Sequence, residues 1–205
     1  MAKQPRTSGL FVIRAIRPED LDPAMRLLNR EITGGVNIFR LIPFDDAAAQ
    51  RWWALHGSGR YQAIVASPAG EPTAEASAAE ESIAQGGSPT VMGWAAVVPH
   101  SAYEGYDRTA EVSIWVDERF RGQGVGKALL RQLLASCPER NLRSLISRIE
   151  SNNVASLRLH EACGFVQSGL LKDIGEKFGQ SLHVAFLQYW VHDALPPTAD
   201  DAAQG

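Results

Sequence analysis

A glycine-rich segment, RGQGVG from Arg121 to Gly126, follows the apolar run VSIWV after four residues and leads into the stretch GVGKALLRQLLASC. Apolar residues recur in that stretch at intervals of three and four, as they do on the buried face of a helix. The order of strand, tight glycine turn and helix predicts an α/β unit. At such a helix start, several backbone N–H groups lack partners and the helix dipole is positive, so the turn suits a di- or polyphosphate. A turn that only joins a strand to a helix is the alternative interpretation.

Two familiar nucleotide motifs do not fit this segment. A P-loop needs glycine at its first position and Ser or Thr at its last, and the chain has Arg121 and Ala128 there. The dinucleotide fingerprint needs a final glycine, and its two possible frames end at Lys127 and Leu129. The spacing therefore excludes both a P-loop enzyme and a dinucleotide-binding fold at this position.

The rest of the chain alternates between strand-like and helix-like patterns. Asp45 is interpreted as the cap of one helix and Gly164 as the stop of another. The order of elements predicts one α/β domain over residues 10–192, built on a central mixed sheet, with flexible tails at 1–9 and 193–205. Strands are expected at 10–16, 61–67, 91–99, 111–117, 142–150, 165–171 and 182–191, and helices at 18–32, 45–56, 124–137 and 153–164.

One internal segment differs in composition from the rest. Residues 67–90 are rich in Ala, Glu, Ser, Gly and Pro, and Ile83 is their only large apolar residue. Such a segment buries little surface, so a mobile surface insertion is expected. A short Ala/Glu-rich helix inside it is the alternative.

Charge and cysteine content exclude several classes of protein. The net charge of −3 gives no basic surface for nucleic acid, and no run approaches the roughly 20 apolar residues of a membrane helix. The apolar run at 10–13 is too short for the core of a signal peptide. The cysteines Cys137 and Cys163 form no disulfide framework and lie in no metal-ligand spacing. We expect a soluble cytoplasmic protein with reduced thiols, no metal, no nucleic-acid partner and no membrane partner.

Two spaced motifs give the glycine segment a more specific meaning. Within VSIWVDERFRGQGVGKALL, the pattern [RQ]-x-x-G-x-[GA] is matched by Arg121, Gly124 and Gly126. Within IESNNVASLRLHEACGFVQSG, the pattern N-x-x-S-x-x-x-[YH]-[EK]-x-x-G-F is matched from Asn153 to Phe165. Together they resemble the GNAT family of acetyl-CoA-dependent N-acetyltransferases. The segments EVSIWV, LHEACGF and KFG are most similar to its phosphinothricin/methionine-sulfone acetyltransferase branch.

The resemblance implies a fold and a donor. The fold is a single GNAT-like domain, with a mixed but mostly antiparallel sheet flanked by helices and a cofactor cleft between splayed central strands. Acetyl-CoA is implied as co-substrate, with its pantetheine arm along the strand at 111–117 and its pyrophosphate at the glycine turn. The residues implied to bind it are Ile114, Trp115, Val116, Arg121, Gly122, Gln123, Gly124, Val125, Gly126, Lys127, Asn153 and Ser156.

The same resemblance suggests the catalytic residues. Glu111 is the candidate general base, because amine acetylation needs a neutral amine and a nearby carboxylate can accept the proton. A solvated or salt-bridged Glu111 is the alternative. His160 occupies the place of a tyrosine that protonates the leaving thiolate in many relatives, so it is expected to donate a proton or to hydrogen-bond the sulfur. A histidine that only caps or packs near the cofactor is the alternative, and Asn153 is open to interpretation as a helix N-cap.

The acceptor is less constrained. Tyr103 and Tyr106 lie in the loop where the branch binds its acceptor. The branch usually has an arginine for the substrate carboxylate where this chain has Ser101, and the residues after KFG also differ. These departures put amino-acid-like acceptors in doubt, although Arg108 is a candidate replacement.

Three functions remain open from the sequence. The first is transfer of an acetyl group to the primary amine of an amino-acid-like or xenobiotic small molecule by direct attack in a ternary complex. The second is a non-catalytic acyl-CoA-binding sensor, and the third is acetylation of a protein or peptide amine. A homodimer is also expected, because relatives of the branch often dimerise and the late strand at 182–191 is long and apolar enough to pair with a partner.

Overall fold

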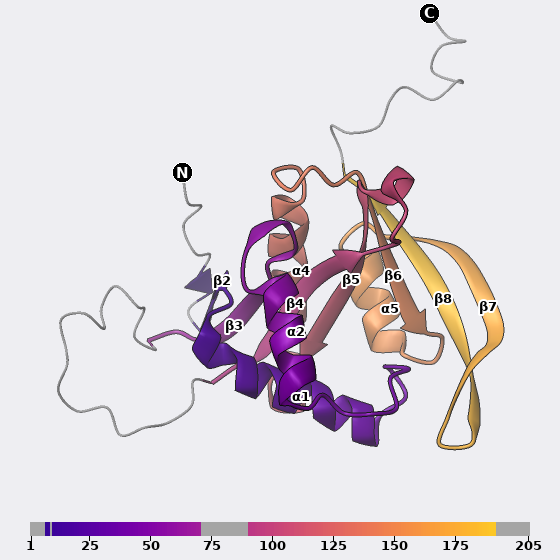
Figure 1. Ribbon diagram of the computed structural model, residues 1–205, viewed down its shortest axis with the longest axis horizontal. Helices are drawn as coiled ribbons and strands as arrows, with labels where there is room; N and C mark the ends of the chain where they lie inside the picture. Colours follow the sequence, from indigo (N-terminus) through magenta and orange to yellow (C-terminus); the bar gives the residue numbers. More distant parts are fainter. Residues whose placement is uncertain (1–6, 9, 71–89, 192–205) are drawn as a thin grey trace, which may run out of the picture.

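A computed structural model describes residues 7–8, 10–70 and 90–191. Its strands form one eight-stranded sheet in the order β1-β2-β3-β4-β5-β6-β8-β7, shown in Figure 1. Every neighbouring pair is antiparallel except β5 and β6, which are parallel. The strands are β1 (Thr7–Ser8), β2 (Phe11–Ala15), β3 (Ile64–Pro68), β4 (Gly93–Pro99), β5 (Thr109–Val116), β6 (Ser144–Glu150), β7 (Val166–Lys177) and β8 (Gln180–Trp190). The mixed, mostly antiparallel α/β fold predicted from the sequence is confirmed.

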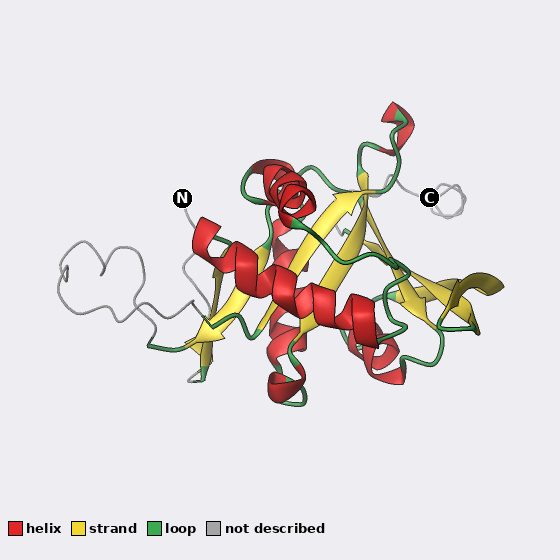
Figure 2. Cartoon of the chain, turned by 60° about the horizontal axis from the view of Figure 1, so that its bottom comes forward, coloured by secondary structure: helices red, strands yellow, loops and turns green. Residues whose placement is uncertain are grey.

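The helices cover both faces of this sheet (Figures 1 and 2). On one face, α1 and α2 bury an apolar cluster against β3 and β4 that includes Trp94 and Leu28. On the other face, α4 buries a larger cluster that includes Leu129, Leu133 and Leu145. The helices are α1 (Leu21–Gly34), α2 (Asp46–His56), α4 (Val125–Ser136) and α5 (Val154–Glu161).

The central strands separate after a short contact. β5 and β6 pair over only three positions, Thr109 to Glu111 with Ser144 to Ile146. Beyond Glu111, β5 continues to Val116 beside β4 alone, and α5 follows β6 on the other side of the opening (Figure 1). This divergence leaves one side of β5 without a strand partner, and it positions the cleft described below.

Helix ends agree with the local sequence signals in most places. The Asp45 side chain accepts a hydrogen bond from the Ala48 N–H at 2.7 Å, so Asp45 is the N-cap of α2 as predicted. Gly164 has φ of 94°, a left-handed conformation that ends the helical segment. Pro18 opens a single 3-10 turn rather than an α-helix, and α1 begins at Leu21.

The two late strands differ most from expectation. β7 runs to Lys177 instead of ending near residue 171, because β-bulges between Leu171 and Gly175 interrupt the alternation that marks a strand. A two-residue turn at Phe178 and Gly179, both with positive φ, joins β7 to β8. β8 lies between β6 and β7, so it is not available for pairing with a partner, and β7 is the edge strand on this side of the sheet. Most of the predicted insertion lies outside the described residues.

Candidate active site

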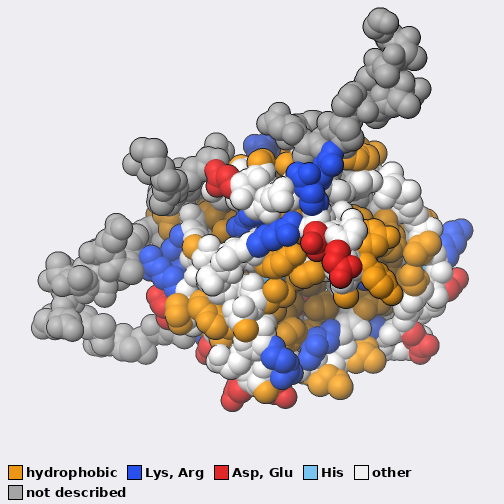
Figure 3. Space-filling view, turned by 45° about the horizontal axis from the view of Figure 1, so that its top comes forward, with side chains coloured by type: hydrophobic (Ala, Val, Ile, Leu, Met, Phe, Trp, Pro, Cys, Tyr) orange, Lys and Arg blue, Asp and Glu red, His pale blue; other side chains and the backbone are white. Residues whose placement is uncertain are grey.

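The opening between β5 and α5 holds two adjoining cavities. The first, of about 530 Å³, is called here the wide cavity, and the second, of about 350 Å³, the loop cavity. They share the lining residues Asn37, Ile114, Trp115, Asn153 and Ser156, so they form one continuous cleft. Figure 3 shows a recess in the molecular surface with apolar walls and with charged side chains of both signs around it.

The loop cavity is built on the glycine segment at the start of α4. Gly122 and Gly124 have φ of 74° and 84°, a left-handed conformation that glycine adopts without strain. Gly124 is the N-cap of α4 and offers no side chain to the N–H groups of the first helical turn. Arg121 and Lys127 add positive charge to the lining. The cavity therefore joins free backbone N–H groups, the positive end of a helix dipole and two cations.

Close packing explains the third glycine of the segment. A Cβ atom at Gly126 would lie 3.3 Å from Leu159 Cδ2 and 3.5 Å from Val116 Cγ2. Glycine therefore allows the start of α4 to approach both α5 and β5, and this approach closes one end of the cleft.

The backbone of β5 supplies hydrogen-bonding groups to the cleft. The Asp117 N–H donates to the carbonyl of Met92, just before β4, at 3.0 Å, and in an antiparallel pair such bonds alternate along the strand. By that alternation the N–H and C=O groups of Ile114 and Val116 point away from β4, toward the cleft. The Val116 carbonyl accepts from Arg121 Nε at 3.1 Å, in agreement with this direction.

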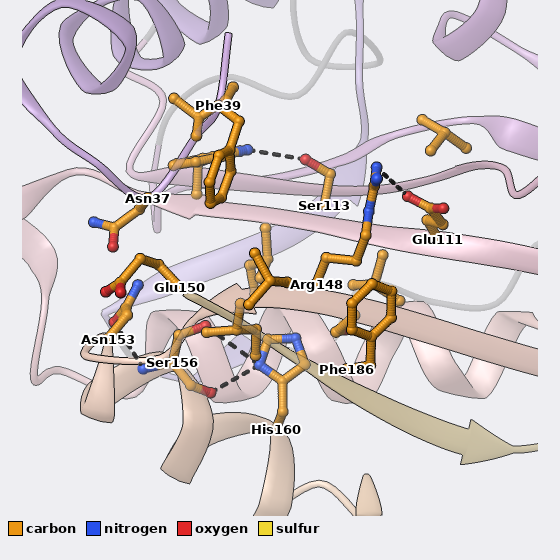
Figure 4. Close-up of a pocket in the computed structure, with 18 of the residues that line it drawn as sticks. Asn37, Phe39, Glu111, Ser113, Arg148, Glu150, Asn153, Ser156, His160 and Phe186 are labelled. Atoms are coloured by element: carbon orange, nitrogen blue, oxygen red, sulfur yellow. Dashed lines mark hydrogen bonds and ion pairs between the residues drawn. The ribbon is translucent and has the colours of Figure 1, made fainter. Parts of the chain in front are cut away.

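One stripe of α5 forms the opposite wall (Figure 4). Asn153, Ser156 and His160 all line the wide cavity, as their spacing predicts. The Asn153 side chain accepts from the Ser156 N–H at 3.1 Å, so Asn153 is the N-cap of α5. Whatever else Asn153 binds, part of its role is structural.

His160 is buried, and one of its ring nitrogens makes a hydrogen bond within α5. Its Nδ1 lies 2.8 Å from the Ser156 carbonyl oxygen, so Nδ1 carries the proton and donates it. Among the described residues, Nε2 has no hydrogen-bond partner. Burial lowers the pKa of His160 below its usual value. The ring is therefore neutral near pH 7, and Nε2 is a hydrogen-bond acceptor.

Glu111 lies in the wide cavity with both carboxylate oxygens engaged. His100 Nδ1 is 3.0 Å from Oε1. Arg148 Nη2 is 2.5 Å from Oε2, as Figure 4 shows. The side chain is 13% exposed. The salt-bridged arrangement, one of the two interpretations from the sequence, is thus present, and a carboxylate nonetheless faces the cleft.

Comparison with known protein families identifies the family to which the chain belongs. The family described as "Acetyltransferase (GNAT) family" matches residues 40–165. The chain belongs to the GNAT acetyltransferase family. It is 31% identical to an L-methionine sulfoximine/L-methionine sulfone acetyltransferase of Pseudomonas aeruginosa, over 86% of this chain and 92% of that protein. It is 30% identical to a phosphinothricin N-acetyltransferase of Alcaligenes faecalis, over 86% and 80% of the two chains.

A solved GNAT structure supports the donor. A phosphinothricin acetyltransferase from Sinorhizobium meliloti, in complex with acetyl-CoA, superposes with a TM-score of 0.75 at 27% identity, over 94% of this chain and 95% of that one. The predicted family, branch and co-substrate are confirmed: this GNAT protein is an acetyltransferase that uses acetyl-CoA. The cleft fits that substrate, because the glycine cradle and cations of the loop cavity suit a pyrophosphate and the free side of β5 suits the amides of a pantetheine arm.

Some residues expected at the cofactor lie elsewhere in this GNAT fold. The Gln123 side chain donates to the Arg119 carbonyl, and Val125 is buried in the core under α4. Neither side chain lines a cavity, so only their backbone groups remain available to the donor. Trp115, by contrast, lines both cavities, and its indole packs toward α1 and donates to Ser113 Oγ.

The aromatic acceptor residues are also outside the cleft. Tyr103 and Tyr106 are exposed and line neither cavity. Tyr106 touches the site indirectly, through an edge-to-face contact with the His100 ring at 5.3 Å. Arg108, the candidate replacement for the missing arginine, reaches the Asn141 carbonyl instead of the cavity.

A loop after α1 forms a wall that the sequence did not indicate. Asn37 to Arg40 line the wide cavity. The buried Lys177 Nζ donates to the Ile38 carbonyl at 2.9 Å, and the Phe39 ring covers Gly175, where a Cβ would lie 2.4 Å from it. The KFG stretch therefore anchors this loop against the β7–β8 hairpin.

Acid should destabilise the free enzyme through its buried histidines. Burial lowers the pKa of both His56 and His160, so the unfolded chain binds more protons than the folded one below about pH 6.5. The free energy of unfolding should therefore fall as the pH is lowered from 7 to 5. Urea titrations at several pH values measure it. His56→Asn and His160→Asn should each reduce this pH dependence. A slope equal to that of wild type in both variants would refute the assignment.

The carboxylate of Glu31 at the loop cavity should weaken binding of the donor. Glu31 lines this cavity and accepts from Arg121 Nη2 at 2.5 Å. In Glu31→Gln the like charge near the pyrophosphate is removed, while the Val116 carbonyl still holds Arg121. We expect the Kd for coenzyme A to fall about 3- to 10-fold in calorimetric titrations at low salt. Glu104→Gln, which removes an exposed carboxylate outside both cavities, is the control and should bind coenzyme A as wild type does. Weaker binding in Glu31→Gln alone would contradict the prediction and show that Glu31 instead orients Arg121.

Proposed function

We propose that this GNAT enzyme acetylates the primary amine of a small, amino-acid-like or xenobiotic molecule by direct attack on acetyl-CoA. The observation that carries the proposal is the wide cavity, which adjoins the loop cavity and holds Glu111 on its wall. Its volume of about 530 Å³ is in the range of small-ligand sites. The relatives named for phosphinothricin and methionine sulfoximine support a small acceptor.

The proposed reaction consumes one ammonium and releases one proton. Glu111, directly or through a water, takes a proton from the ammonium, and the amine nitrogen then bonds to the thioester carbon. The Val116 N–H, which points toward the cleft, stabilises the charge that develops on the carbonyl oxygen. The carbon–sulfur bond breaks, the sulfur takes the second proton of the amine nitrogen, and Glu111 releases the first, so the products are the acetylated amine, coenzyme A thiol and a proton in solution.

The geometry of His160 favours one of its two expected roles. We propose that it lies beside the donor sulfur and that its Nε2 accepts a hydrogen bond from the thiol of the product coenzyme A, with Asn153 and Ser156 along the pantetheine arm. A resident proton donor would need an imidazolium ring or a proton on Nε2. The hydrogen bond from Nδ1 to the Ser156 carbonyl and the lowered pKa both argue against these states.

An amine panel tests the proposal. Protein and acetyl-CoA are incubated with amino acids, their decarboxylated amines, polyamines and peptides, and free thiol and acetylated product are measured together. We expect thiol release with small amines and little with peptides. Tight binding of acetyl-CoA without any thiol release would favour the non-catalytic sensor, and release with peptides alone would favour the protein-acetylating alternative.

We also propose a homodimer that uses the free edge of the sheet. Val166, Leu170, Leu171 and Ile174 are exposed apolar residues on β7, a strand of 12 residues at the edge. Unpaired edges with apolar side chains are suited to pairing with another chain. Sedimentation velocity should give twice the monomer mass of 22.3 kDa, and Leu170→Lys should restore the monomer. A monomer at every concentration would refute this proposal.

A cytoplasmic location is proposed as well. Cys137 and Cys163 are free thiols, which suit a reducing compartment. No helix in the described ranges is both long and apolar enough to span a membrane. Cell fractionation followed by immunodetection tests the location, and recovery from the periplasm or medium would contradict it.

A further inference from the structure

Arg148 is a cation of the wide cavity that the sequence did not single out. It lies on β6, its side chain is 58% exposed, and it reaches across the opening to Glu111 on β5 (Figure 4). Its guanidinium carries five N–H donors in a planar fork that matches a carboxylate with two parallel hydrogen bonds. Arg148 lines the wide cavity, and the ion pair with Glu111 is made by Nη2.

The other charged groups of the wide cavity are held by their own loops. Glu150 accepts from the Asn152 N–H and side-chain amide at 2.9 and 3.1 Å, which fixes the turn before α5. Arg40 donates to the Ile42 carbonyl and lies over the Phe44 ring at 4.2 Å. Arg148 and Glu111 are therefore the pair of opposite charges on this wall that is free to exchange partners.

We propose that Arg148 is the specificity-determining residue for the acceptor: it binds an anionic group next to the acceptor amine and, in doing so, releases Glu111. The inference rests on the proposed acetylation of a small amine. An α-amino acid presents a carboxylate and an ammonium on one carbon. Its carboxylate replaces Glu111 on the Arg148 fork, and its ammonium takes the Glu111 oxygen that Arg148 leaves.

Charge balance favours this exchange over binding of a simple amine. One ion pair on the wall is replaced by two, and no charge is left unpaired in the cleft. An amine without a carboxylate either competes with Arg148 for Glu111 or leaves the guanidinium without its partner. Recognition of the acidic group therefore also prepares the proton acceptor, because a Glu111 oxygen bound to Arg148 is less available to an ammonium.

Matched pairs of acceptors test the proposal. The probes are L-methionine with 3-(methylthio)propylamine and L-phenylalanine with phenethylamine, assayed by thiol release. Wild type should show a kcat/KM about 100-fold higher for the amino acid of a pair. Arg148→Gln should lose this preference because kcat/KM falls for the amino acid, while kcat for the decarboxylated amine rises, because Arg148 no longer occupies Glu111. Arg148→Lys should retain part of the preference.

Arg108→Gln is the matched comparison. It removes a guanidinium that lies close in sequence to β5 but outside the cavity lining, so the preference should stay as in wild type. An unchanged preference in Arg148→Gln, or its loss in Arg108→Gln, overturns the proposal. A fall in kcat for both members of a pair in Arg148→Gln, with unaltered coenzyme A affinity, also overturns it, because Arg148 would then act on the chemistry alone. If wild type acetylates no amine, the proposed function fails instead.

Discussion

Glu111→Gln should lower kcat/KM about 100- to 10,000-fold at pH 7, the range typical for loss of a general base. Glutamine keeps the shape of the side chain and one oxygen that can accept from Arg148, but it accepts no proton. A free amine needs no base, so the deficit should shrink as the pH rises toward the pKa of the acceptor ammonium. Initial rates of thiol release between pH 6.5 and 10 measure both effects.

Glu176→Gln is the control for this experiment, because it removes an exposed carboxylate of β7 outside both cavities. Its rates should match those of wild type at every pH. If Glu111→Gln were slower than wild type by the same factor at all pH values, Glu111 would be a structural ion-pair partner and not the base.

Gly124→Val should abolish most of the affinity for coenzyme A, with an expected rise in Kd of at least about 30-fold. A β-branched residue is strongly disfavoured at a φ of 84°, so the turn that presents the N–H groups of α4 must change. The backbone strain should also cost about 2 kcal/mol of stability. Calorimetric titration with coenzyme A and urea unfolding measure the two effects separately.

Gly59→Val separates strain from binding. Gly59 has φ of 76°, and a Cβ there, as at Gly124, would meet no atom within 4 Å. The control should lose a similar amount of stability and keep its affinity for coenzyme A. Equal losses of affinity in both variants would mean that general destabilisation, and not the glycine cradle, explains the effect.

The parts of the cleft that could be predicted from the sequence each lie within one short segment of the chain. The turn from Gly122 to Gly126 and the stripe of α5 each lie within one short segment, so local spacing was enough to place them on the cleft. The opening between β5 and β6 followed only from the family resemblance. It depends on a register in which three positions pair and the rest diverge, and no local pattern encodes such a register.

The lining of the wide cavity, where the acceptor is proposed to bind, could not be predicted from local sequence patterns. Arg148 and Glu111 meet across two strands, and the loop at 37–40 is held by Lys177, about 140 residues away in the chain. The Nδ1 hydrogen bond of His160 depends on its burial and on the Ser156 carbonyl one turn earlier. Alternation along 142–150 did place Arg148 on the same strand face as Glu150, and that was the one available signal for it.

A crystal structure of the enzyme with acetyl-CoA tests the central claim most directly. The account predicts the pyrophosphate against the N–H groups of residues 122–127, with the pantetheine amides bonded to Ile114 and Val116. The thioester should lie between Val116 and His160 and open toward Glu111 in the wide cavity. A pyrophosphate bound away from the start of α4, or a thioester that cannot be reached from the wide cavity, would contradict the account.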